Sequence, residues 1–273
     1  MVNQQFADQY HAEIYSAFRP NIPTVLAEKI KSSLKEEYHG SLDRAVDVGC
    51  GSGQSTIILA DHFRKVWGID ASEAQIHEAN NSRTHPNITY VSAPAEILPF
   101  RDQSVQLVTA AACLHWFQMD IFFSEVRRVL VHNGIFAAYT YHSLRPIVID
   151  AVWKTQVDLV FDQIYEELHP YWSAEVLISL EKYETIEFPF GKVSRIPDVK
   201  QIFSGRFSDI IGFIESLSAY QNMRKEDSEK AEALISTFSF RLKEILEAAG
   251  ICCNDTMKLY RTFFPIICRK TEV

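Results

Sequence analysis

The stretch RAVDVGCGSG, residues 44–53, decides how this chain folds. It begins as a short apolar run typical of a buried β-strand and ends in three glycines at alternate positions. Glycine has no Cβ, so this loop turns sharply and brings its backbone N–H groups against a ligand. The amphipathic segment 54–63 follows and is predicted to be a helix. We therefore expect a strand, a ligand-binding loop and a helix, which together begin an α/β fold.

Short apolar runs alternate with amphipathic segments as far as residue 141. Helices are predicted at 72–80 and 119–130. The predicted strands are VWGID, NITYVS, VQLVTAA and GIFAAYTY. This alternation is typical of βαβ units, so we predict a Rossmann-like, doubly wound and mostly parallel sheet with helices on both faces.

Four regions are expected along the chain. They are a helical N-terminal cap (1–40), a cofactor-binding core (41–143), lid or substrate insertions with one core strand near 184–190 (144–222), and a C-terminal helix with the closing strand of the core (223–273). Pro265 lies inside the closing run RTFFPIICRK. Proline donates no hydrogen bond to a strand ladder, so an edge or bulge position is predicted for it.

Composition narrows the function. Of 273 residues, 47% are hydrophobic and 23% are charged, which is typical of a globular protein. The net charge of -8 and the scattered lysines and arginines argue against a nucleic-acid partner. No apolar run approaches the ~20 residues of a membrane span, and the N-terminus lacks the pattern of a secretion signal, so a cytoplasmic protein is expected. Five cysteines without CxxC spacing, and histidines without HxxxH spacing, predict no metal site.

Two acidic residues beside the glycine loop bear on the kind of cofactor. A dinucleotide fingerprint would require glycine at position 54, which is Gln54. Asp47 precedes the first glycine by two residues, where a carboxylate would repel a pyrophosphate but favour a cationic cofactor. Asp70 ends the strand VWGID and can accept hydrogen bonds from a ribose diol, or cap the helix that begins near Ser72. Both roles are compatible.

The segments VDVGCGSGQ, GID, SAPAEILPF and VQLVTAAACLHWF, in this order over residues 44–141, resemble motifs I to IV of the class I S-adenosylmethionine-dependent methyltransferases. The resemblance implies S-adenosylmethionine as cofactor and a seven-stranded sheet of order 3-2-1-4-5-7-6. More narrowly, YSAFRPNIP, AAACLHWF, FPF and SLSAY resemble the trans-aconitate methyltransferase branch of that family.

The resemblance also implies which residues contact the cofactor. The glycine loop would contact the methionine part, Asp70 the ribose, and the residues after the third strand the adenine, although Pro94 stands where many relatives have aspartate. The full set of candidate cofactor residues is Arg19, Asp47, Gly49, Gly51, Gly53, Asp70, Ala95, Glu96, Ala111 and Ala112.

His115 follows the fourth predicted strand, at the carboxyl edge where open α/β sheets bind ligands, and is the candidate catalytic residue. A hydroxyl or a protonated amine would need it as a base, whereas a carboxylate is already a nucleophile at neutral pH. Its alternative role is that of a packed histidine that takes no proton. The candidate residues of the acceptor pocket are Tyr15, Trp116, Tyr141, Arg145, Trp172 and Arg206.

These observations predict a methyltransferase, either monomer or homodimer, that acts on a small molecule. Carboxyl O-methylation is the narrower hypothesis, and hydroxyl, thiol and amine acceptors stay open. Two other classes are an NAD-dependent oxidoreductase and a module that holds the cofactor without catalysis.

Overall fold

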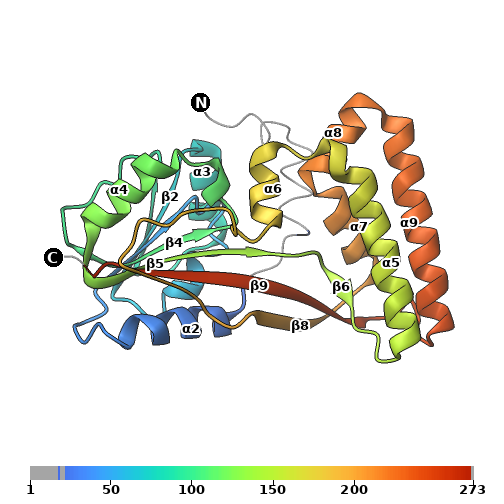
Figure 1. The fold of residues 1–273 in the computed structure, drawn as a ribbon, viewed down its shortest axis with the longest axis horizontal. Helices are drawn as coiled ribbons and strands as arrows, with labels where there is room; N and C mark the ends of the chain where they lie inside the picture. The colour runs from blue at the N-terminus through green and yellow to red at the C-terminus, as the bar shows by residue number, and fades with distance from the viewer. Residues whose placement is uncertain (1–17, 19–21, 272–273) are drawn as a thin grey trace.

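The computed structural model describes Phe18 and residues 22–271, which form a central sheet with helices on both faces and a helical lobe at one end (Figure 1). This arrangement confirms the predicted α/β fold. The first five strands are β1 (Arg44–Val48), β2 (Lys65–Asp70), β3 (Ile88–Ser92), β4 (Val105–Ala111) and β5 (Leu130–Tyr141).

These five strands form the parallel part of the sheet, in the order β3-β2-β1-β4-β5. The order changes direction between β1 and β4, because β2 and β3 lie on one side of β1 and β4 on the other. Open sheets of this kind bind ligands at such a switch point, outside the carboxyl ends of the strands. The glycine loop follows β1 at this point.

The last strand, β9 (Met257–Arg269), runs antiparallel beside β5 and lies inside the sheet. Phe263 pairs with Tyr141 of β5 and also with Val199, the first residue of β8 (Val199–Gly205), so β5 and β8 lie on opposite edges of β9. The short strand β7 (Lys192–Arg195) pairs with β9 on the β8 edge, opposite β5. The two-residue strand β6 (Arg145–Pro146) also pairs with β9, on the edge opposite β8, which is the edge that β5 occupies.

The expected order 3-2-1-4-5-7-6 therefore describes this sheet, with β9 as the seventh strand and β7 with β8 as an interrupted sixth. Pro265 lies in the interior strand β9 and not at an edge, contrary to that expectation. It lies opposite the break between β7, which pairs up to Ile266, and β8, which pairs up to Phe263. The missing N–H of proline is tolerated because no partner strand faces it there.

Helices cover both faces of the sheet. Helix α2 (Thr24–Lys35) packs Leu26, Ile30 and Leu34 on one face, and α4 (Met119–Val129) packs its phenylalanines and valines on the other. Helix α3 (Glu73–Ser82) begins at Ser72, whose side chain accepts a hydrogen bond from the backbone N–H of Gln75. Helices α3 and α4 lie close to their predicted positions, and α2 lies within the expected helical cap.

Two elements differ from the sequence-based predictions. Residues 54–63 form turns around the short 3₁₀ helix η2 (Ile57–Leu59) and not the predicted α-helix. The strand expected near 184–190 is absent, because these residues are irregular and pack Ile186, Phe188 and Phe190 against the α4 face of the core. An apolar residue at every second position satisfies this packing as well as it would a strand, and β7 begins only at Lys192.

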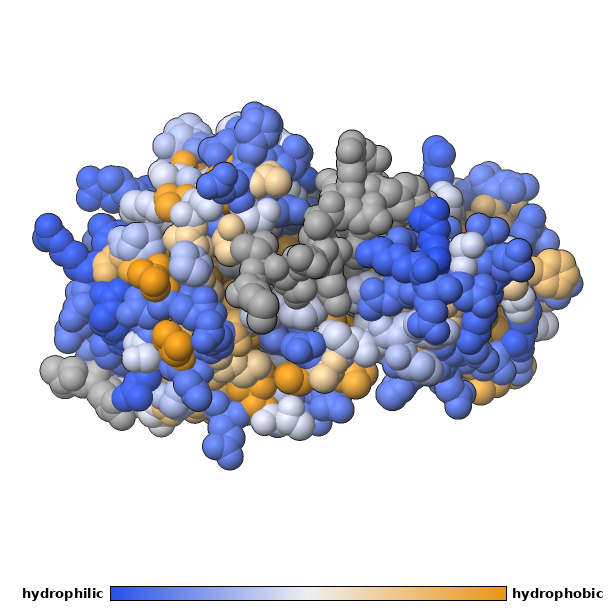
Figure 2. Space-filling view, turned by 90° about the horizontal axis from the view of Figure 1, so that it is seen from above, coloured by the Kyte–Doolittle hydropathy of each residue, from blue (hydrophilic) through white to orange (hydrophobic). Residues whose placement is uncertain are grey.

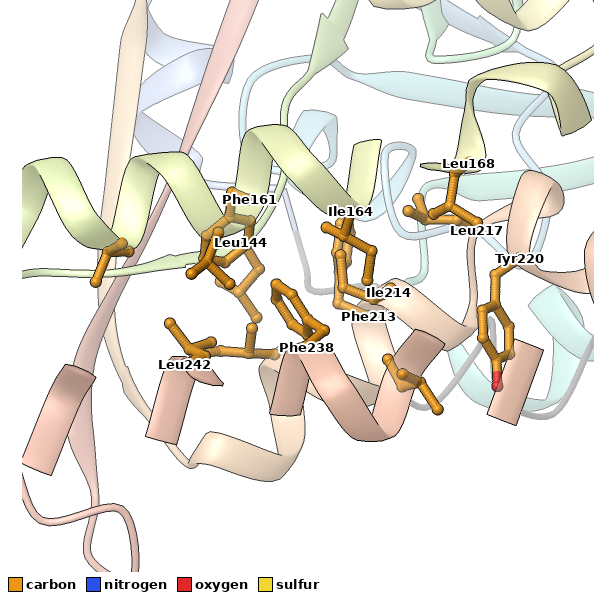
Figure 3. Packing of buried hydrophobic residues seen from close by; sticks show 14 of the residues in the cluster. Leu144, Phe161, Ile164, Leu168, Phe213, Ile214, Leu217, Tyr220, Phe238 and Leu242 are labelled. Atoms are coloured by element: carbon orange, nitrogen blue, oxygen red, sulfur yellow. The ribbon is translucent and has the colours of Figure 1, made fainter. Parts of the chain in front are cut away.

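The helical lobe consists of α5 (Ala151–Leu168), α7 (Phe207–Glu215), α8 (Ser218–Glu226) and α9 (Ser228–Ala248), and α6 (Ala174–Leu180) lies between it and the sheet (Figure 1). Its own hydrophobic cluster joins Phe161 and Ile164 of α5 to Phe213 of α7 and Phe238 of α9 (Figure 3). Because α9 packs in this lobe, the insertion after β5 and the C-terminal helix form one unit.

The molecular surface in Figure 2 is mostly hydrophilic, with apolar side chains in small separate groups. Large apolar side chains that are exposed in the described part include Ile97, Ile149 and Phe240. Among the described helices, none is long and apolar enough to cross a membrane.

Candidate active site

The three glycines of the loop all adopt left-handed backbone conformations, with φ of +69° at Gly49, +52° at Gly51 and +88° at Gly53. A Cβ at Gly49 would lie 2.6 Å from Cys113 Sγ, and a Cβ at Gly53 would lie 2.4 Å from Tyr90 Oη. At Gly51 the nearest atom would be Gln75 Oε1 at 3.6 Å. Gly49 and Gly53 are therefore packed against the protein, whereas a Cβ at Gly51 would make only an ordinary van der Waals contact with the end of the Gln75 side chain.

Asp70 joins the glycine loop to the start of α3. Its Oδ2 accepts a hydrogen bond of 2.9 Å from the Gly51 N–H, and its Oδ1 accepts one of 2.9 Å from the Ser72 N–H. Burial raises the pKa of Asp70, while the two backbone donors act to lower it. Each carboxylate oxygen has a second lone pair, so both bonds leave acceptor capacity for a ribose hydroxyl.

Asp47 lies fully buried beneath the loop. Its Oδ2 accepts hydrogen bonds from Ser55 Oγ at 2.6 Å and Thr56 Oγ1 at 2.8 Å, and its Oδ1 accepts one from Thr109 Oγ1 at 2.7 Å. Burial raises the pKa of Asp47, and the three hydroxyls act to lower it. Asp47 thus ties β1 to β4 and to the turn after the glycines, so within the described structure it supports the loop from below.

The residues expected beside adenine follow β3. Ala95 is buried, and Oε1 of Glu96 accepts a hydrogen bond of 2.9 Å from the backbone N–H of Gln118, the residue before α4. This contact draws the segment after β3 toward the segment after β4. Together with the loosely packed Gly51, the Asp70 carboxylate, Ala95 and Glu96 form an edge that fits a nucleoside cofactor.

The chain after β4 links this cofactor edge to a second site. Ala112 has a left-handed φ of +51°, which is uncommon for a residue with a Cβ. Cys113 Sγ then donates to the Val48 carbonyl at 3.2 Å, at the end of β1. The next residues form the 3₁₀ helix η3 (Leu114–Trp116), from which His115 and Trp116 line a pocket.

The His115 ring is only 7% exposed. Its Nδ1 lies 3.2 Å from Tyr183 Oη, and its ring centroid lies 4.7 Å from that of Trp116. Burial lowers the pKa of His115 to about 4, although the carboxylate of Glu175 acts to raise it. The imidazole is therefore neutral at pH 7.

A pocket of about 270 Å³ opens between the sheet edge and the helical lobe. The residues that line it come from the end of β4, the end of β5, and the helices α5, α6 and α7. The sequence-predicted residues that line it are Ala112, His115, Trp116, Tyr141, Arg145 and Trp172. We call this space the acceptor pocket.

Other predicted residues lie elsewhere. Arg206 precedes α7 and lines a separate groove with Phe207 and Ser208, so it does not contribute to the acceptor pocket. Its position in an irregular segment gave no indication of which side of α7 it would face. Arg19 and Tyr15 lie outside the described residues.

Arg145 reaches the acceptor pocket with its charge already paired. Its Nη1 lies 2.6 Å from Asp158 Oδ1, its Nη2 lies 3.7 Å from Asp162 Oδ1, and its guanidinium lies over the Phe161 ring. Arg145 is thus held by α5, and binding of an acceptor carboxylate to it would compete with these aspartates.

The structure adds pocket residues that sequence analysis passed over. His142, Ser143 and Thr140 follow from the predicted strand β5, and their positions at its carboxyl end could have indicated them. The others are Asp162, Tyr165, Val176, Ser179, Leu180, Phe213, Ser216, Leu217 and Ser218, which only helix packing brings together.

Arg261 lies behind the pocket wall. It is fully buried in β9, and its guanidinium lies 4.9 Å from the centroid of the Tyr141 ring and 5.2 Å from that of Phe213. The residues two positions before and after it in β9, Leu259 and Phe263, are also buried. The sequence could therefore have indicated Arg261, because it places an arginine on the apolar side of the predicted strand.

The fold and the cofactor edge define a class I methyltransferase, and comparisons with known proteins agree. Residues 46–138 match a methyltransferase domain model. A Dictyostelium discoideum protein described as a putative methyltransferase is 30% identical over 254 residues, which cover 92% of this chain and 89% of that protein. CRG1 of Saccharomyces cerevisiae is described as a probable S-adenosylmethionine-dependent methyltransferase. It is 26% identical to this chain, and the alignment covers 94% of this chain and 95% of CRG1.

A solved structure, described as that of a putative type II methyltransferase from Anaeromyxobacter dehalogenans, aligns with a TM-score of 0.76 and 27% identity, and the alignment covers 92% of this chain and 97% of that one. The chain therefore belongs to the S-adenosylmethionine-dependent methyltransferases, and its cofactor is S-adenosylmethionine. This result confirms the predicted enzyme class, and it sets aside the oxidoreductase and the non-catalytic module.

Proposed function

We propose that this enzyme methylates a small molecule bound in the acceptor pocket, and that the acceptor atom is a carboxylate oxygen. The observation that carries the proposal is the pocket of about 270 Å³ that meets the cofactor edge at Ala112 and is lined by a neutral His115. Ligand pockets of proteins are typically about 300–1,000 Å³, so this space suits a small metabolite.

In this site the cofactor would lie along Gly49, Gly51 and Asp70, with its adenine toward Ala95 and Glu96. When bound, S-adenosylmethionine supplies a methyl carbon on a sulfonium, and its displacement leaves the neutral thioether S-adenosylhomocysteine. The protein mainly has to align the acceptor with that carbon, and such alignment can supply roughly 7–11 kcal/mol. Trp116, Tyr141 and Trp172 provide walls that exclude water from the reacting atoms.

Two features favour a carboxylate. A base with a pKa of about 4 removes a proton from a hydroxyl poorly, whereas a carboxylate carries no proton at neutral pH. The resemblance to the trans-aconitate methyltransferase branch supports the same acceptor class.

Hydroxyl methylation is the second candidate. It is favoured by the buried, neutral imidazole at the pocket wall, because a neutral histidine has one nitrogen able to accept a proton. Thiol and amine acceptors follow the same logic. The two classes differ in how much they need His115.

The test is a panel of small carboxylic acids, phenols, thiols and amines incubated with S-adenosylmethionine labelled in the methyl group. We expect transfer to carboxylic acids, and we expect His115→Ala to weaken it by about tenfold without abolishing it, since no proton has to be removed. Loss of all transfer in His115→Ala would instead indicate a hydroxyl acceptor. Binding of S-adenosylhomocysteine, followed by calorimetry, serves as the control that the variant retains its cofactor site.

Transfer to peptides or nucleic acids, with none to any small molecule in the panel, would contradict the proposal.

A further inference from the structure

Tyr183 follows the C-terminus of α6 in an unusual backbone conformation. Its N–H donates to the Ile178 carbonyl at 3.0 Å, and the Lys182 N–H donates to the Ser179 carbonyl at 3.0 Å. These two bonds form the Schellman motif that ends many helices, in which glycine usually occupies the left-handed position. Here Lys182 has a φ of +56° and Tyr183 a φ of +57°, so two consecutive residues with side chains adopt a left-handed conformation.

The surrounding structure holds this turn in place. Arg195 of β7 donates to the Lys182 carbonyl at 2.9 Å and to the Tyr183 carbonyl at 3.1 Å. Because β7 is paired with β9, the turn is fixed to the central sheet. Backbone strain of this kind persists only where neighbouring contacts determine it, and it often marks a functional position.

The strained turn places a phenol against the candidate catalytic histidine. The Tyr183 side chain is fully buried, and its Oη lies 3.2 Å from His115 Nδ1. Helix α6 is itself fixed to β5, since Ser179 Oγ lies 2.7 Å from Thr140 Oγ1, and both residues line the acceptor pocket. The contact between Tyr183 and His115 thus connects two rigid elements.

The proton on Oη is the one available to His115. Burial raises the pKa of Tyr183, so the phenol keeps its hydrogen at neutral pH. A phenol O–H is a stronger hydrogen-bond donor than its ring-conjugated oxygen is an acceptor, so the 3.2 Å contact is favoured with Oη donating its hydrogen to Nδ1. A neutral imidazole that accepts at Nδ1 carries its hydrogen on Nε2.

We propose that Tyr183 is a positioning residue that holds His115 in a single orientation, with Nδ1 as acceptor and Nε2–H directed toward the acceptor pocket. This inference rests on the proposed function in that the pocket is taken to bind the methyl acceptor. An Nε2–H donor orients a carboxylate but takes no proton from a hydroxyl. The role of His115 would then be to align the nucleophile.

The test uses the full chain labelled with ¹⁵N-histidine and needs no acceptor. His115 signals are assigned by their loss in His115→Gln, and long-range ¹⁵N–¹H spectra at pH 7 identify which ring nitrogen carries hydrogen. We expect a pyridine-like Nδ1 and a pyrrole-like Nε2 in the wild type. In Tyr183→Phe, which keeps the buried ring and removes only the hydroxyl, we expect both nitrogens to move toward intermediate values.

Tyr139→Phe is the matched control, because Tyr139 is also buried but packs on the α2 face of the sheet. It should leave the His115 signals as in the wild type. Unchanged His115 signals in Tyr183→Phe would overturn the proposal. So would a wild type in which Nδ1 carries the hydrogen or both nitrogens are averaged, and this result requires no folded variant.

Turnover gives a second readout once an acceptor is found. Tyr183→Phe should lower kcat about tenfold and leave the binding of S-adenosylhomocysteine unchanged. The control variant Tyr139→Phe should keep the wild-type kcat. An unchanged kcat would contradict the positioning role. If no small molecule is methylated while the wild-type tautomer is as expected, the proposed function fails and the Tyr183–His115 contact stands.

Discussion

Gly51 and Gly250 both have left-handed backbones, with φ of +52° and +78°, yet only Gly51 lies at the cofactor edge. Alanine at either position strains the backbone, which should lower the free energy of unfolding by about 1 kcal/mol. We expect Gly51→Ala also to weaken S-adenosylhomocysteine binding by at least about tenfold, because its Cβ would enter the space beside the loop. Calorimetry and urea unfolding of both variants check this, and equal affinities would contradict the placement of the cofactor.

His115 makes stability depend on pH. Its pKa of about 4 in the folded protein lies below the ordinary 6.5, so the unfolded chain takes up the proton first as the pH falls. The contribution of the neutral His115 side chain to the free energy of unfolding is fully present above pH 6.5 and is lost as the pH falls toward 4. Between pH 7 and pH 5 we expect this group to remove about 2 kcal/mol from the free energy of unfolding.

In His115→Gln the free energy of unfolding should fall less between pH 7 and pH 5, by the amount that His115 contributes. Urea unfolding at the two pH values measures this difference. His132 is exposed, and His132→Gln should keep the wild-type pH dependence. Parallel curves for all three proteins would show that His115 titrates in the folded state near its ordinary pKa.

At the scale of elements, the end of α2 is fastened to the sheet by Arg269 of β9. This side chain is buried, and it donates to the carbonyls of Ser33, Leu34 and Asn133. Arg269→Met would remove this donor from the Ser33 and Asn133 carbonyls, whereas the Leu34 carbonyl also accepts from the Tyr38 N–H, and each carbonyl left without a donor costs about 1–3 kcal/mol. We expect roughly 3 kcal/mol less stability by urea unfolding.

Lys192→Met is the control for this prediction. Lys192 contacts Glu37, as Arg269 does, but its ion pair is exposed, so the change should be within about 0.5 kcal/mol. Similar losses in the two variants would mean that the contact with Glu37, and not the backbone carbonyls, is what stabilises the end of α2.

The whole molecule has two lobes that meet at the acceptor pocket, with the cofactor edge on the sheet side (Figure 1). Hydrogen–deuterium exchange with S-adenosylhomocysteine should therefore show protection in residues 47–56 and 70–75. Helix α9, on the far side of the helical lobe, should exchange as in the free protein. Protection concentrated in α5 and α9 would place the nucleoside outside the glycine loop.

The sequence by itself determined the part of the protein that depends on local pattern. Alternating apolar and amphipathic segments predict β1 to β5 with α3 and α4, because one period suits a strand and the other a helix. The glycine loop and Asp70 follow from the same order, since parallel strands bring their carboxyl ends to one edge. His115 and Trp116 were found because they follow a strand of that sheet at its carboxyl edge, and Tyr141 ends the next strand.

Tertiary structure alone decided what surrounds the acceptor. The period-two pattern at 184–190 predicted a strand, but the segment packs on the sheet face, because burial of alternate side chains does not require a strand partner. Arg206 faces another groove, and Tyr183 reaches His115 only through the strained turn after α6. These contacts join residues far apart in the chain, and side-chain packing, which no local pattern encodes, sets them.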